Sequence, residues 1–173
     1  MRCIIVGAGD FFPKKLDVNG ALVIAADGGR ESLDKMGITP DICIGDFDSL
    51  GYVPSCNETL TLPVEKDVTD TFAAADLAIE RGYDEIELYG ALGGDRFSHS
   101  LANLQLLVYL KKKGVKAALY DEKCTVRVLS NESVGYADAG HVSYIAASDE
   151  AVISITGMKY SGEGFRIRND FPL

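Results

Sequence analysis

Along the first two thirds of the chain, segments with the apolar pattern of a strand alternate with segments that have the apolar pattern of a helix. Short runs rich in Ile, Val and Ala predict strands, and stretches with apolar residues at helical spacing predict the helices between them. Strands that alternate with helices form a parallel sheet with helices on its faces. We therefore expect an α/β fold, with a Rossmann-like parallel sheet and helices on both faces. The predicted strands are residues 2–7, 21–26, 41–45, 58–64, 85–89 and 115–120, and the predicted helices are residues 29–36, 69–81 and 98–113.

The pattern changes after about residue 121. Four short, alternating runs rich in β-branched residues follow, which predicts a small C-terminal antiparallel β unit. We expect an α/β nucleotide-binding catalytic domain over residues 1–121 and a β-rich domain over residues 122–173. Four strands make a thin sheet whose edges need cover, so we expect either a second subunit or a truncated chain. The four runs are residues 123–129, 141–147, 151–156 and 164–169.

Composition narrows the classes of function. The net charge of −9 argues against a nucleic-acid partner, because phosphate backbones bind basic faces. No apolar run approaches the ~20 residues that span a bilayer, and the N-terminal run is too short for a signal peptide. We therefore expect a cytoplasmic protein without a membrane partner. The four cysteines form no C-x-x-C pair, and we interpret them as reduced thiols.

The segment from Gly45 to Ser49 carries the strongest chemical signal. Asp46 and Asp48 are separated by one residue, in a segment that directly follows the apolar residues 42–44. Like charges this close disfavour ionisation unless a cation lies between them, and an all-oxygen site suits Mg²⁺. The alternative is an ordinary polar turn after a strand.

Three further loops follow predicted strands, and ligands bind where such loops meet at one edge of a parallel sheet. The first contains paired glycines after Asp27, the second is acidic and precedes a helix, and the third combines glycines with Arg96 at another helix start. We expect Asp46, Asp48 and Asp70 to bind Mg²⁺, Arg96 to bind phosphate, and Lys66 to place a charge on a phosphate. The binding residues predicted from these loops are Asp27, Gly28, Gly29, Ser49, Lys66, Asp67, Thr69, Gly93, Gly94, Arg96 and His99.

Each of these residues also has a structural interpretation. Thr69 and Asp70 carry oxygens that cap helices well. His99 suits a packed or solvated position in a first helical turn, and Asp27 suits a turn. These alternatives stay open at the level of sequence.

The order of the four motifs resembles the thiamine pyrophosphokinase family over roughly residues 21–110. The resemblance implies a two-domain homodimer that uses Mg²⁺ and transfers a pyrophosphoryl group from ATP to thiamine, releasing AMP. It also implies that Asp46, Asp48 and Asp70 are the catalytic and metal-binding acids. Asp27, Arg96 and Asn103 match residues that line the family's cleft between subunits.

Two features depart from the family pattern. An extra residue, Asp95, follows the paired glycines, and Ser98 stands where the family has an aspartate. Family chains also continue beyond the position of Leu173 with a stretch that helps to form the thiamine pocket. Asp95 is the residue that we expect to substitute for the missing acid.

The mechanism that this reading implies is an in-line attack of the thiamine hydroxyl on the β-phosphorus of ATP, promoted by positioning and charge neutralisation. Either Asp70 or Asp67 orients the hydroxyl. Two alternatives remain. One is a haloacid-dehalogenase-like phosphatase, which also carries Asp-x-Asp after a strand. The other is a nucleotide- or thiamine-binding protein that has lost its chemistry.

Overall fold

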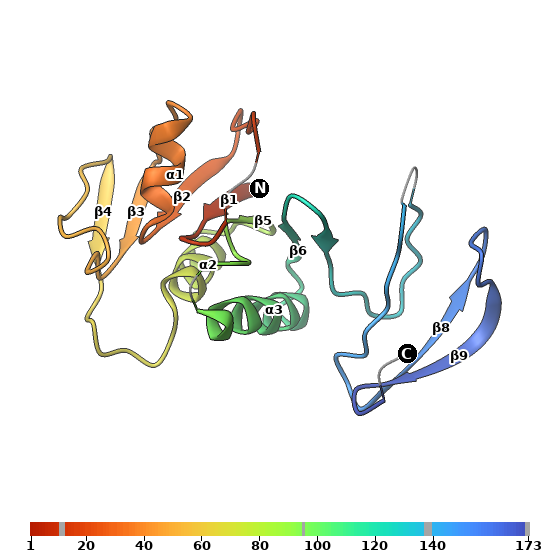
Figure 1. Ribbon diagram of the computed structural model, residues 1–173. Coiled ribbons are helices and arrows are strands. Elements are labelled where there is room, and N and C mark those ends of the chain that lie inside the picture. Colours follow the sequence, from red (N-terminus) through yellow and green to blue (C-terminus); the bar gives the residue numbers. More distant parts are fainter. Residues whose placement is uncertain (11–12, 95, 137–139, 172–173) are drawn as a thin grey trace. The chain divides into compact units, whose positions relative to one another are not determined.

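The computed structural model describes residues 1–10, 13–94, 96–136 and 140–171. Within it the chain forms two compact units, Met1–Val128 and Leu129–Leu173 (Figure 1). Within the described residues, no helix has both the length and the apolar character needed to cross a membrane.

The first unit contains a seven-stranded sheet in the order β4-β3-β2-β1-β5-β6-β7. All neighbours in it are parallel except β6 and β7. From β1 the chain adds strands outward to β4, and then returns to the other side of β1 with β5. The strand order therefore reverses between β1 and β5, which is where open α/β sheets bind ligands. The strands are β1 (Arg2–Val6), β2 (Leu22–Ala26), β3 (Ile42–Gly45), β4 (Glu58–Thr61), β5 (Glu85–Tyr89), β6 (Lys116–Tyr120) and β7 (Thr125–Val126).

Helices cover both faces of this sheet, as the sequence predicts. Helix α1 (Gly29–Lys35) lies on one side, and α2 (Asp70–Glu80) and α3 (Phe97–Lys112) lie on the other (Figure 1). Alternate residues of β1 divide between the two cores: Ile4 packs on the α1 side and Ile5 on the side of α2 and α3, both fully buried. Burial on both faces explains why the strands are continuous apolar runs.

Local signals set the helix ends. Thr69 caps α2 by accepting a 3.2 Å hydrogen bond from the Phe72 amide, and Gly82 ends this helix in the left-handed conformation, with φ at 84°. Helix α3 begins after Arg96 without a side-chain cap. The predicted α/β fold class is confirmed.

The second unit contains one two-stranded antiparallel sheet, formed by β8 (Glu150–Ile155) and β9 (Gly162–Arg168). The prediction of four strands here is wrong. Residues 141–147 form no strand, although their side chains alternate between exposed and more buried positions. Of the predicted strand over residues 123–129, only β7 is present. A tight turn, in which the Asp121 amide donates to Cys124 O, folds β7 back onto β6. This strand therefore belongs to the first unit.

Candidate active site

The loops after β1 and β5 run together at the point where the strand order reverses. The Gly9 amide donates to Gly90 O at 2.7 Å, and the Asp10 amide donates to Leu92 O at 2.9 Å. A Cβ atom on Gly9 would lie 2.3 Å from Leu92 O, so only glycine permits this approach. The β1 loop contains none of the predicted site residues, although its Gly-x-Gly pattern after the first strand was a usable signal.

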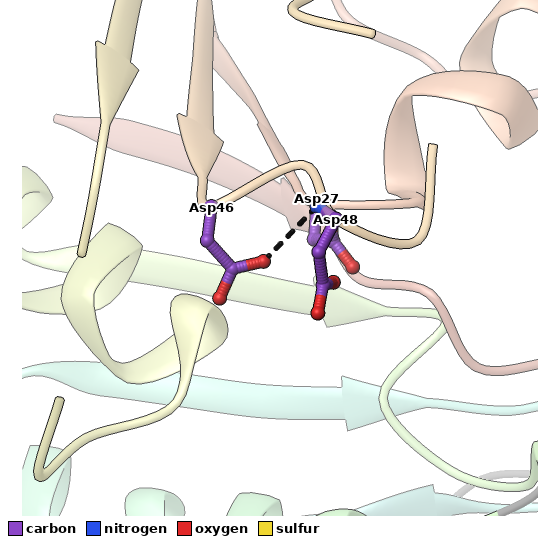
Figure 2. A group of neighbouring side chains, drawn as sticks. All are labelled: Asp27, Asp46 and Asp48. Carbon is purple, nitrogen blue, oxygen red and sulfur yellow. Dashed lines mark hydrogen bonds between the residues drawn. The ribbon is translucent and has the colours of Figure 1, made fainter. Parts of the chain in front are cut away.

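Three carboxylates form an acid triad at the ends of β2 and β3. Asp27, Asp46 and Asp48 each offer one ligand oxygen, and these oxygens lie within 4.8 Å of one another. Figure 2 shows the three side chains grouped at the strand ends. The parallel pairing of Ala26 with Ile44 brings the two loops together, because each loop begins just after this pair.

Phe47 gives the Asp-x-Asp segment its shape. Its side chain is 3% exposed and packs in the core beneath α1, while its backbone has φ of 59°. A bulky residue adopts this conformation only where its surroundings enforce it, at a cost of about 1–3 kcal/mol. The buried ring anchors the turn, and the Asp48 amide donates a 3.2 Å hydrogen bond to Asp46 Oδ1 (Figure 2).

Asp27 has one satisfied and one unsatisfied oxygen. Ser49 Oγ donates to Asp27 Oδ2 at 2.7 Å, whereas Asp27 Oδ1 is buried without a hydrogen-bond partner among the described residues. A buried, unpaired carboxylate oxygen is costly. A cation held by Asp27 and its two neighbours would remove that cost, and a small set of carboxylate oxygens is what Mg²⁺ prefers. The acid triad therefore fits a magnesium ion.

Lys66 lies between two acidic residues. Its ammonium donates to Asp46 Oδ2 at 2.5 Å and lies 3.2 Å from Asp70 Oδ1. The hydrogen bond from Lys66 lowers the pKa of Asp46. Burial raises the pKa of Asp70, and the charges of Asp46 and Asp27 add to that rise. Burial alone would lower the pKa of Lys66, but its two acidic partners outweigh it and the pKa is raised.

A cavity of about 200 Å³ opens at the reversal of strand order. Its lining brings together most of the predicted binding residues, from loops after β2, β3 and β5 and from the start of α2. Ala8, Gly9 and Thr71 line it as well and were not predicted. The predicted residues that line it are Asp27, Ser49, Thr69, Asp70, Gly93, Gly94, Arg96, His99 and Asn103.

A second cavity of about 600 Å³ lies between the β1 loop and α1. Gly28 and Ser49 are the predicted residues that line it. The polar residues of α1 that share this lining were not predicted as site residues. These residues are Glu31, Ser32 and Lys35.

Several predicted residues have structural roles or lie apart. Asp67 is exposed and lines neither cavity. Gly29 is buried, and a Cβ atom there would lie 1.9 Å from Val6 O, so it serves helix packing. Asn103 is buried and donates to Ala91 O at 2.8 Å, which fixes the β5–α3 loop. Asp95 lies outside the described residues.

Comparisons of the sequence with known proteins identify one family. Residues 14–119 match the family model described as "Thiamin pyrophosphokinase, catalytic domain". The thiamine pyrophosphokinase of Bacillus subtilis (strain 168) is 31% identical over 177 residues, covering 92% of this chain and 81% of that protein.

Solved structures agree as well. A crystal structure of thiamine pyrophosphokinase from Bacillus subtilis aligns with a TM-score of 0.82 and 28% identity, over 100% of this chain and 87% of the other. One from Geobacillus thermodenitrificans aligns with a TM-score of 0.77 and 28% identity, over 98% and 84%. The resemblance read from the motifs is confirmed: the chain is an enzyme of the thiamin pyrophosphokinase family.

Proposed function

We propose that the chain transfers a pyrophosphoryl group from ATP to thiamine, forming thiamine diphosphate and AMP, at the acid triad and the 200 Å³ cavity. The observation that carries the proposal is the buried, unpaired Oδ1 of Asp27 beside Asp46 and Asp48. Such an arrangement is costly without a cation, and a cation at this point serves phosphate chemistry.

Asp27, Asp46 and Asp48 are the residues that would hold Mg²⁺. When bound, the ion would neutralise charge on the phosphate oxygens during transfer. Asp70 stays a predicted ligand, but its contacts favour another role. Its buried Oδ1 lies 3.2 Å from the Lys66 ammonium, and the residue lines the cavity.

This placement supports Asp70 as the group that orients the acceptor hydroxyl. A carboxylate has about four acceptor sites, so Asp70 can accept a hydrogen bond from a hydroxyl in the cavity while it pairs with Lys66. Asp67, the other candidate, is exposed and lines no cavity. Asp70 and the triad member Asp27 line the same cavity, so the acceptor and the proposed metal position would lie close together.

The loop between β5 and α3 is the proposed phosphate-binding element. Gly93 and Gly94 both have positive φ, at 73° and 74°, so their backbone can approach an anion closely. Arg96 follows at the start of α3 and lines the same cavity. A guanidinium near a helix N-terminus suits a phosphate.

A homodimer is part of the proposal. The second unit exposes large apolar side chains, with Ile145 at 88%, Val152 at 60% and Phe165 at 40% exposed. A two-stranded sheet is marginal without cover, and a second copy would supply it. The cytoplasm stays the proposed location, since all four cysteines are free thiols, as expected in a reducing compartment.

The test is an assay of AMP release from ATP and Mg²⁺, with and without thiamine. We expect AMP and thiamine diphosphate in equal amounts, and only when thiamine is present. Saturable ATP binding without AMP would instead support a binding protein that has lost its chemistry. A trapped aspartyl-phosphate on Asp46 would support the phosphatase, whose nucleophile normally follows the first strand, whereas Asp46 follows β3.

A further inference from the structure

The ammonium of Lys66 is held in place by three oxygens. Besides its contacts with Asp46 and Asp70, Nζ donates to Pro63 O at 3.3 Å. The side chain is only 13% exposed. A lysine that reached outward for substrate would keep its charge in water. Lys66 instead keeps its charge inside the acidic cluster.

Asp46 divides its two oxygens between two neighbours. Oδ2 accepts from Lys66, while Oδ1 accepts from the amide of Asp48, whose side chain completes the acid triad with Asp27. One carboxylate therefore joins the proposed metal position to a second position, between Asp46 and Asp70, where the ammonium lies.

The charges explain why something positive must occupy that second position. Asp27, Asp46 and Asp48 group their carboxylates at the triad, and Lys66 links Asp46 to the carboxylate of Asp70, so four acidic side chains share this region. Among the ion pairs of the described residues, Lys66 is the only cation that pairs with any of the four. One divalent ion on the triad would leave the pair Asp46 and Asp70 to be neutralised separately.

We infer that the Lys66 ammonium takes the place of a second divalent cation between Asp46 and Asp70, so that the cluster holds one metal ion and Asp70 stays free of metal. An ammonium is a compact charge with three donors, and as part of the chain it cannot be exchanged for a metal. The inference rests on the proposed function, because it takes the acid triad as the metal site.

The test counts bound Mn²⁺, used as a paramagnetic substitute for Mg²⁺, by electron paramagnetic resonance of the nucleotide-free protein. We expect one ion per chain in the wild type and in Lys66→Arg, which keeps the charge. Lys66→Met keeps the length but removes the charge, and we expect it to bind a second ion. The double variant Lys66→Met with Asp70→Asn should return to one ion. Thermal unfolding of each variant checks that it folds.

Two results would overturn the inference. One is a wild type that already binds two ions. The other is a Lys66→Met protein that still binds one ion with unchanged affinity. If that variant also has a raised KM for ATP, Lys66 is a phosphate ligand instead. Asp48→Asn tests the proposed function separately: if it leaves the first ion bound, the triad is not the metal site, whatever Lys66→Met shows.

Discussion

Ser49 Oγ donates a 2.7 Å hydrogen bond to Asp27 Oδ2, and this bond joins the loop after β3 to the loop after β2. Both residues line the 200 Å³ cavity. With Oδ2 engaged, Asp27 presents its buried Oδ1 as the free ligand atom. The hydroxyl therefore orients a proposed metal ligand from outside the triad.

Replacing Ser49 by alanine should weaken the metal site more than the fold. Loss of one hydrogen bond to a charged group corresponds to about 1.5–3 kcal/mol, so we expect Mg²⁺ affinity to fall roughly tenfold or more. Isothermal titration calorimetry with Mg²⁺ measures it. Ser49→Thr should retain most of the affinity, and Ser55→Ala, an exposed serine in the same segment, is the matched control. Equal affinities in all four proteins would exclude this role for the hydroxyl.

Asp48→Ala should abolish turnover while the fold survives. Asp48 is exposed and packs against no core, but it supplies one of the three triad oxygens. Steady-state AMP release with ATP and thiamine is the measurement. Residual activity above about a tenth of the wild-type kcat, which is ~1.4 kcal/mol in barrier, would contradict the metal role. Glu65→Ala, an exposed acid away from both cavities, should be unaffected.

The sequence predicted the position of the site better than its internal contacts. In a parallel sheet the loops after the strands share one edge, so Asp27, Asp46 and Gly93 could be brought together from strand order alone. The cap at Thr69 was equally predictable, because it depends on residues three positions apart. Both predictions use short-range patterns or a general property of the fold.

The contacts of Lys66 and the shape of the second unit depended on packing between distant segments. Nothing near residue 66 in the sequence shows that its charge meets Asp46, twenty residues away. The runs at 123–129 and 141–147 have the period of strands, but a strand also needs a neighbour to pair with. Residues 125–126 pair with β6, and residues 141–147 form no strand.

Phe47→Ala should destabilise the first unit and loosen the Asp-x-Asp turn. The buried ring fills the core beneath α1, and removing a buried phenylalanine typically costs about 3–5 kcal/mol. Urea unfolding followed by circular dichroism measures the free energy of unfolding. Phe97→Ala is the control, because that side chain is 81% exposed and its loss should cost less than about 0.5 kcal/mol. Similar values for both variants would show that Phe47 does not anchor the turn.

Gly9→Ala should damage both stability and activity, because the added Cβ would lie 2.3 Å from Leu92 O and 2.7 Å from Gly90 O. Both are backbone atoms, so relief requires the β1 and β5 loops to separate at the wall of the cavity. Overpacking of this kind typically costs about 1–3 kcal/mol. Gly135→Ala is the matched control, since a Cβ there meets nothing within 4 Å. Gly9→Ala should lower the midpoint of thermal unfolding and raise the KM for ATP. Gly135→Ala should change neither quantity. If Gly9→Ala lowers the midpoint but leaves the KM for ATP unchanged, the close approach of the two loops supports the fold without shaping the nucleotide site.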